Sequence, residues 1–102
     1  MAKNIKKYED DLQARLKDQG YAVDYLNAVL EDEGEDQQSR FLMALKDVAK
    51  AHGVANIAHD SEVTREALYR VLSEKGNPEL ATLLSVLAAL GLKMKFATDE
   101  AS

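Results

Sequence analysis

Short blocks of apolar residues at helical spacing fill most of this chain. Within each block the apolar positions lie three and four residues apart, which is the spacing of one face of an α-helix. Isolated helices of this length are marginal in water, so several must pack together around a shared core. The sequence therefore predicts an all-α fold, and one proline and five glycines leave little of the 102 residues for linkers.

Turn and cap residues divide this pattern into helices. Gly20 is predicted to end a first helix. After a second apolar stripe, a third and clearly amphipathic block runs from Phe41 to about Gly53. Asn77–Pro78, a capping residue followed by proline, predicts the start of a last helix that Gly91 ends.

The segment Leu92–Phe96 differs from the rest because apolar and basic residues alternate in it. This alternation is typical of a β-strand. A lone strand needs a partner, so we expect either a short C-terminal strand paired with its copy in a second chain or an extended tail. Together with the last helix, this segment is predicted to form the interface of a homodimer.

The charge of the chain is unevenly distributed. The net charge is -5, and residues 1–36 hold ten acidic and only five basic side chains, whereas residues 37–102 are neutral. We therefore predict an acidic N-terminal helical arm at 1–36, a second unit at 37–97 and a tail at 98–102. The arm favours a basic partner and disfavours nucleic acid.

Several function classes lack the residues that they need. The chain has no cysteine, which excludes disulfides, cysteine-based zinc sites and a thiol nucleophile, and which fits a cytoplasmic protein. The only histidines, His52 and His59, have no carboxylates at metal-ligand spacing. There is no nucleophile–base pair, no glycine-rich phosphate loop and no apolar run near the roughly 20 residues of a membrane span. We expect no enzyme, no membrane protein, and no cofactor, metal or small-molecule substrate.

The stretch HDSEVTREALYRVL, from His59 to Leu72, predicts two short helices joined by a tight turn. A helix-turn-helix needs a small residue where the helices touch, an apolar residue in the turn and an inward stripe on the second helix. Ala58 and Val63 meet the first two needs, and Thr64 is a good N-cap for the second helix. The inward stripe is Leu68, Val71 and Leu72.

The residues left outward on the second helix suit DNA. Arginine can bond guanine bidentately, and hydroxyls can bond phosphate. An ordinary amphipathic helix of a small bundle is the competing interpretation, and Glu66 fits it by stabilising the helix N-terminus. The predicted DNA-binding residues are Asn56, Thr64, Arg65, Glu66, Tyr69, Arg70, Lys75 and Asn77.

The stretch GVANIAHDSEVTREALYRVLSEKGNPELATLLSVLAALGLKM resembles the helix-turn-helix domain of HigA-type antitoxins, the addiction-module antidote proteins of the lambda-repressor-like class. The likeness extends to YLNAVLED and RFLMALKDVAKAHG upstream, and covers roughly Asp18 to Phe96. The resemblance implies a five-helix domain that binds a palindromic operator in double-stranded DNA as a dimer. It also implies repression of its own operon and neutralisation of a basic RelE/HigB-like ribonuclease toxin.

Two residues depart from the family pattern. Glu62 stands in the turn where the family usually has glycine, and Ala55 stands where it usually has a capping serine or threonine. Both changes lower the expected affinity for DNA, the first through strain and repulsion of phosphate, the second through a lost capping bond. Two alternatives therefore stay open: a protein-only toxin neutraliser, and a solitary transcriptional regulator without a toxin.

Overall fold

A computed structural model describes residues 2–99 and shows six helices and no strand within them. The resemblance implied a five-helix domain, so the helix count is a correction. The helices are α1 (Ala2–Leu16), α2 (Gln19–Glu31), α3 (Gln37–His52), α4 (Val54–Asp60), α5 (Arg65–Val71) and α6 (Leu80–Ala89). None of them is long and apolar enough to cross a membrane.

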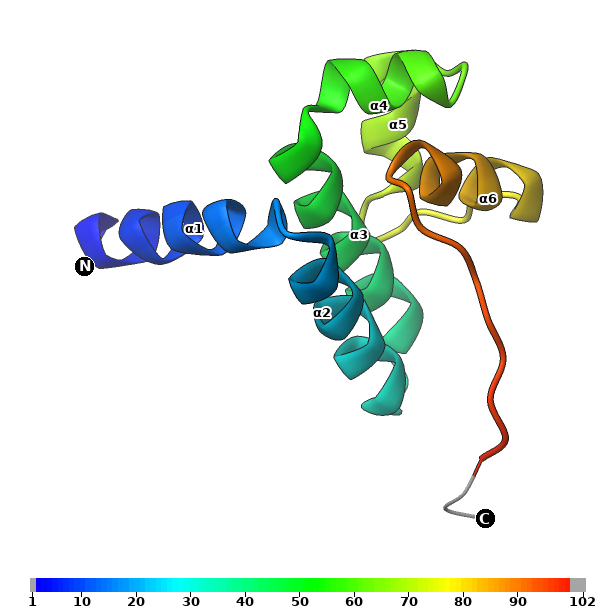
Figure 1. Cartoon of the computed structure of the whole chain (residues 1–102), viewed down its shortest axis with the longest axis horizontal. Helices are drawn as coiled ribbons and strands as arrows, with labels where there is room; N and C mark the ends of the chain where they lie inside the picture. The colour runs from blue at the N-terminus through cyan, green and yellow to red at the C-terminus, as the bar shows by residue number, and fades with distance from the viewer. Residues whose placement is uncertain (1, 100–102) are drawn as a thin grey trace.

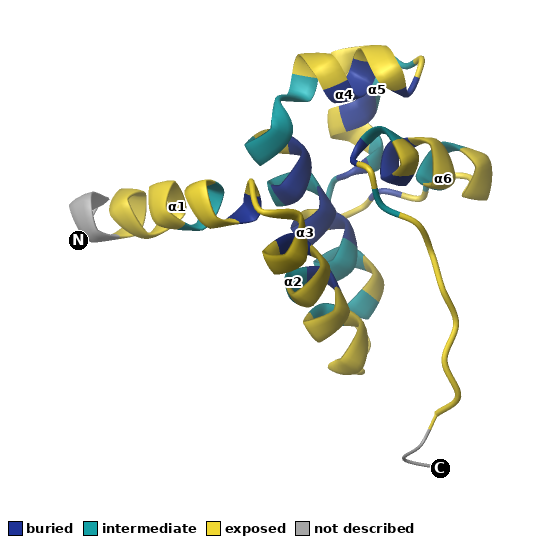
Figure 2. Ribbon diagram, viewed as in Figure 1, coloured by how far each residue is buried: buried dark blue, intermediate teal, exposed yellow. Residues whose placement is uncertain are grey.

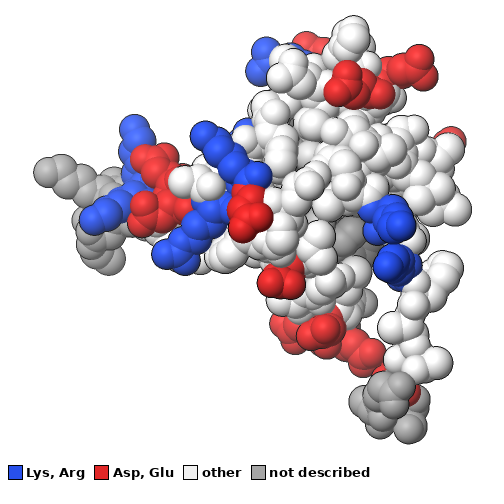
Figure 3. Space-filling view, viewed as in Figure 1, with Lys and Arg blue, Asp and Glu red and all other residues white. Residues whose placement is uncertain are grey.

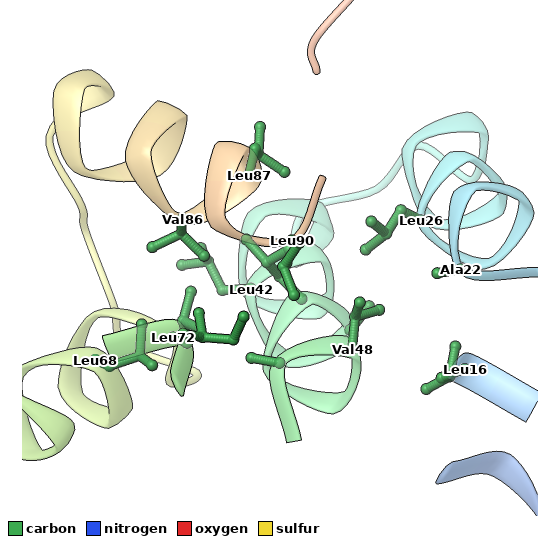
Figure 4. Close-up of a cluster of buried hydrophobic side chains, with 14 of the residues drawn as sticks. Leu16, Ala22, Leu26, Leu42, Val48, Leu68, Leu72, Val86, Leu87 and Leu90 are labelled. Carbon is green, nitrogen blue, oxygen red and sulfur yellow. The ribbon is translucent and has the colours of Figure 1, made fainter. Parts of the chain in front are cut away.

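Helix α3 is the centre of the fold, and α1, α2 and α4 pack against it (Figure 1). Its inward side chains Leu45 and Val48 are fully buried, as its amphipathic pattern predicted. Leu68 and Leu72 approach the same core from the α5 side, and Val86 of α6 closes it (Figures 2 and 4). One apolar core therefore connects the α1–α2 end with the α4–α6 end.

The break between α1 and α2 differs from the prediction. Gly20 does not end a helix; it lies in the first turn of α2, and its backbone N–H donates to the Asp18 carboxylate at 3.1 Å. Asp18 is the N-cap of α2, with an extended backbone. Aspartate at this position satisfies an N–H that the helix itself cannot, so α1 ends at Leu16 and a new helix begins.

A polar link holds α1 and α2 to α3. The Tyr25 hydroxyl donates to the Asp47 carboxylate at 2.8 Å, and the Gln13 side-chain amide donates to the Asp47 carbonyl at 3.1 Å. Burial of the phenol and its bond to Asp47 raise the pKa of Tyr25. Asp47 thus receives one bond from each of the two N-terminal helices.

The last helix starts later than Asn77–Pro78 predicted. Glu79 is extended, with ψ 153°, and the first backbone bond of α6 runs from the Leu83 N–H to the Glu79 carbonyl. Pro78 therefore lies before the helix. Gly91 follows the helix end as predicted, with φ +76°.

The C-terminal segment is an extended tail, one of the two forms that its sequence predicted, and it forms no strand within the single chain. Residues 92–99 have no regular secondary structure. A strand forms only when its backbone groups pair with a neighbouring strand, and no second strand exists within residues 2–99 of this chain. The tail leaves α6 and runs down beside the lower half of the molecule (Figure 1).

Helix α1 projects from the body (Figure 1). Only its C-terminal end is covered: Leu16 is fully buried and Leu12 is half-buried against the core. Ile5 and Tyr8, which continue the same apolar stripe, are 60% and 70% exposed. The stripe that predicted this helix is therefore longer than the surface that buries it.

Candidate nucleic-acid interface

Helix α4 is the first half of the candidate site. Its N-cap is Gly53, at φ +97°, and no side chain caps it. Ala55 is therefore not the capping residue, as the sequence suggested, but an exposed residue inside the helix. The capping bond is missing all the same, because glycine has no side chain to supply it.

The turn after α4 is held by three backbone bonds. The Ser61 N–H donates to the Ile57 carbonyl at 2.9 Å, the Glu62 N–H to the His59 carbonyl at 3.1 Å, and the Val63 N–H to the Ala58 carbonyl at 3.0 Å. Glu62 has φ +60°, the left-handed conformation that favours glycine. The strain foreseen for a non-glycine residue at this position is therefore present.

Helix α5 is seated by the cap and the apolar stripe that the sequence predicted. The Thr64 hydroxyl accepts a bond from the Ala67 N–H at 3.0 Å. Leu68 is buried in the same core as Ala58 and Ile57 of α4. Val63 packs half-buried against this core, so the turn is closed by an apolar side chain.

The outward face of α5 carries the predicted DNA-binding side chains. Arg65, Glu66, Tyr69 and Arg70 are all exposed, and Thr64 is exposed at the start of the helix. In the described part of the chain, neither arginine forms an ion pair. Their guanidinium groups are therefore available to an anion.

The other three predicted residues lie on neighbouring segments. Asn56 is exposed on α4, and Lys75 and Asn77 are exposed on the connection from α5 to α6. That connection is fixed to α3, because the Gln38 amide donates to the Gly76 carbonyl at 3.3 Å. No hydrogen bond among the described residues joins these three side chains to α5.

Charges of both signs meet at this end of the molecule (Figure 3). Glu62 and Glu66 are exposed beside the two arginines, and His59 lies 3.3 Å from the Asp60 carboxylate at the end of α4. A bound polyanion would meet local cations rather than a broad basic field. Affinity would depend on a few well-placed bonds more than on net charge.

Sequence reasoning missed two polar features. Ser61 is buried, with a relative exposure of 7%, and its hydroxyl has no hydrogen-bond partner among the described residues. The Tyr25–Asp47 bond was also missed, although Tyr25 lies in the apolar stripe of α2 and Asp47 directly precedes buried Val48. A tyrosine within a predicted core stripe was the available signal, because a buried phenol needs a partner.

No group of three or more histidine, aspartate or glutamate side chains in residues 5–99 could hold a metal ion.

Comparison with known proteins identifies the family. Residues 5–98 match the model of the family described as "Probable addiction module antidote protein". The chain is also 42% identical over 71 residues to an uncharacterized protein of Haemophilus influenzae, a match that covers 70% of each chain. No solved structure matches this chain at a significant level. The matched range extends from the exposed part of α1 to residue 98 in the tail, so the chain belongs to the family of addiction module antidote proteins.

Proposed function

We propose that this protein is an antitoxin that binds a palindromic operator as a homodimer through α4, the turn and α5, and represses its own operon. We further propose that it neutralises a basic ribonuclease toxin of the RelE/HigB type. The family supports the antitoxin role. The observation that carries the DNA-binding role is α5, a short helix buried on one side by Leu68 and exposed on the other through Arg65, Tyr69 and Arg70.

The position of these side chains along α5 assigns their roles. Arg65 is the first residue of the helix, and residues at the N-terminal end of a recognition helix are those that meet base edges in the major groove. Tyr69 and Arg70 lie one turn further, where phosphate is the expected contact. Thr64, Lys75 and Asn77 would add contacts to the DNA backbone from the ends of the same unit.

A dimer is part of this proposal. One short helix contacts only a few base pairs, and paired half-sites about 34 Å apart are the usual arrangement for such domains. Two copies related by a two-fold axis would match the two-fold symmetry of a palindrome.

The arm formed by residues 1–36 is proposed to bind the toxin, and residues 37–97 the DNA. The arm holds most of the acidic side chains of the chain, and its projecting helix α1 exposes Ile5 and Tyr8. Exposed apolar side chains supply contact area, and acidic groups around them raise the rate of association with a basic protein.

Glu62 favours a second candidate function. Its carboxylate is exposed at the turn, where it would approach the phosphate of a bound duplex. In a protein that neutralises a toxin without binding DNA, this carboxylate would not oppose the function.

The two candidate functions are distinguished by whether the protein prefers its operator to a random duplex. Fluorescence anisotropy of the promoter DNA upstream of the protein's own gene, at several salt concentrations, should show saturable binding that exceeds binding to a random duplex of equal length. Co-expression with the neighbouring toxin gene should restore growth. Rescue of growth with equal, weak affinity for both duplexes would favour the protein-only candidate and overturn the operator-binding role.

A further inference from the structure

An apolar groove of about 610 Å³ lies between α2 and the C-terminal tail. Leu26, Phe41 and Leu87, from three different helices, form part of its lining, and tail residues 92–96 form one wall. The rim is open to water, since Leu30 is 48% exposed and Phe96 is 96% exposed. A groove lined in this way offers a site for apolar side chains of another molecule.

The tail carries its apolar and its basic side chains on opposite sides. It is extended, and successive side chains of an extended chain alternate between the two sides. Met94 and Phe96 therefore lie on the side of the groove, and Lys93 and Lys95 on the side away from it. The lysine charges are directed away from whatever enters the groove.

The α2 rim of the groove is acidic. Asp24 and Glu31 are exposed, and each directly follows a residue that lines the groove. Neighbouring positions on a helix are turned by about 100°, which puts both carboxylates on the solvent side of the lining stripe. In the described part of the chain neither forms an ion pair, whereas Asp32 and Asp36 already bind Arg40, each at 2.9 Å. Such a groove fits an apolar side chain that has basic residues beside it.

The proposed toxin is the partner with this chemistry, because it is a basic protein. Helix α2 belongs to the acidic arm, residues 1–36, which is already proposed to bind the toxin. A second copy of this chain would instead bring a net charge of -5 to an acidic rim. The groove also lies away from α5 (Figure 1), so its occupant leaves the proposed DNA-reading surface uncovered.

We infer that the groove between α2 and the tail is a second docking site for the toxin. The toxin inserts an apolar side chain into the groove and places basic side chains beside Asp24 and Glu31. In Figure 1, α1 projects to one side of α2 and the tail runs down the other side, so the toxin contacts the arm from both sides. This inference rests on the proposed function, because the toxin is its partner.

The first test removes an apolar contact at the rim. Leu30→Ser should weaken toxin capture about tenfold, measured by titration of the purified proteins. The side chain is half exposed, so thermal unfolding should change little. The matched control is Met43→Ser, which removes a similarly exposed apolar side chain from α3, outside the groove. Capture that was weakened equally by both variants, or by neither, would overturn the inference.

The second test concerns the acidic rim. Glu31→Lys should slow association with the toxin about threefold to tenfold, because a basic group then meets a basic partner. Glu31 is the last residue of α2, where a cation is compatible with the helix dipole. Glu74→Lys, at an exposed position outside the arm, changes the net charge equally and should slow association less than about twofold. Equal slowing would mean that the overall charge, and not this rim, attracts the toxin.

The third test identifies the occupant. A photoreactive phenylalanine analogue replaces Phe96 in the full chain, which is co-expressed with the neighbouring toxin gene and irradiated. The chain should become cross-linked to the toxin, because this side chain lies at the rim of the groove. The same analogue at Tyr69 of α5 is the matched control and should give no cross-link to the toxin. A cross-link at position 96 only to a second copy of this chain, or none at all, would overturn the inference.

The same analogue at Tyr8 separates this inference from the proposed function. Tyr8 is 70% exposed on the α1 stripe, which is proposed to bind the toxin in any case. Cross-linking at position 8 without cross-linking at position 96 would remove the groove and leave the toxin-binding role of the arm. If the wild-type chain formed no complex with the toxin, the proposed neutralisation itself would be wrong, and the groove would lose its partner.

Discussion

Helices α1 and α5 both lie at the periphery of the molecule, but they present opposite kinds of surface. Helix α5 is only seven residues long, buries its apolar side through Leu68 and exposes charged and hydroxyl groups. Helix α1 has 15 residues, is anchored through Leu16 and exposes Ile5 and Tyr8 along the rest of its apolar stripe. A polar outer face suits a hydrated, charged ligand such as DNA, whereas an uncovered apolar stripe suits a protein surface.

Amphipathicity alone therefore does not identify a functional face. The apolar stripes of both helices follow the same spacing rule. What separates them is how much of each stripe the core covers, and this depends on where the neighbouring helices end. The α1 stripe is longer than the surface that buries it, whereas Leu68 and Leu72 of the α5 stripe are buried and Val71 is half-buried.

The largest expected effect is on stability and separates the two helices directly. Leu68→Ala should lower the free energy of unfolding by about 2–5 kcal/mol, because it leaves a cavity in the core under α5. Ile5→Ala, an equally apolar truncation on α1, should change it by less than about 0.5 kcal/mol, because the side chain is already exposed. Urea denaturation measures both. Equal losses for the two variants would mean that α1 is packed as tightly as α5.

The second prediction concerns the toxin. The double variant Ile5→Ser, Tyr8→Ser should weaken toxin capture by about tenfold to a hundredfold, the effect of removing one or two central contacts, with DNA binding unchanged. Arg65→Ala is the matched control, with the opposite pattern. Surface variants are preferable to removing residues 1–20, because that deletion would also remove fully buried Leu16. Undiminished toxin capture by the double variant would exclude the α1 stripe as a docking surface.

The third prediction tests the polar anchor of the arm. Tyr25→Phe should lower the free energy of unfolding by about 1–2 kcal/mol at pH 7, because the half-buried carboxylate of Asp47 loses its hydroxyl donor. Tyr21→Phe, at an exposed tyrosine on the same helix, should be nearly neutral.

This contribution of Tyr25 has a predictable pH dependence. Burial and the bond to Asp47 raise the pKa of Tyr25, so the folded protein keeps the phenol neutral at pH values where the unfolded chain, with an ordinary pKa near 10, ionises. The stability difference between wild type and Tyr25→Phe should be constant from about pH 7 to 9 and shrink as the pH rises above about 10. A difference that grew over this alkaline range would contradict the assignment.

The smallest effect is expected at the turn. Glu62→Gly should stabilise the protein by about 0.5–1 kcal/mol, because glycine adopts φ +60° without strain. It should also strengthen DNA binding by removing a carboxylate near phosphate. Glu66→Gly is the matched control and should destabilise by a similar amount, about 1 kcal/mol, because it places glycine inside a helix. If both variants changed the stability in the same direction, the interpretation of Glu62 as a strained residue would be wrong.

The sequence predicted those parts of the fold that local rules decide. The stripe of α3, the Thr64 cap, the inward Leu68 and the glycine after α6 all follow from helical spacing and capping. These features depend on residues within one or two helical turns of each other.

The errors, and the choice left open between a strand and a tail, concern features that local rules do not decide. Whether Gly20 ends a helix depends on Asp18 competing to start the next one, and whether residues 92–96 form a strand depends on a partner outside the sequence window. The Tyr25–Asp47 bond joins residues 22 positions apart, and no local pattern predicts such a pair. The exposure of Ile5 could not be predicted either, because periodicity marks a face without saying how far the core extends.

Helix α5 is proposed to read DNA sequence through Arg65. The direct test is the ratio of operator to random-duplex affinity, measured by fluorescence anisotropy across a salt series for wild type, Arg65→Ala and Arg70→Ala. Arg65→Ala should lose about 1–3 kcal/mol per half-site on the operator alone and bring this ratio close to one. Arg70→Ala should weaken both duplexes alike and reduce the salt dependence. An Arg65→Ala protein that kept wild-type affinity and sequence preference would contradict the claim.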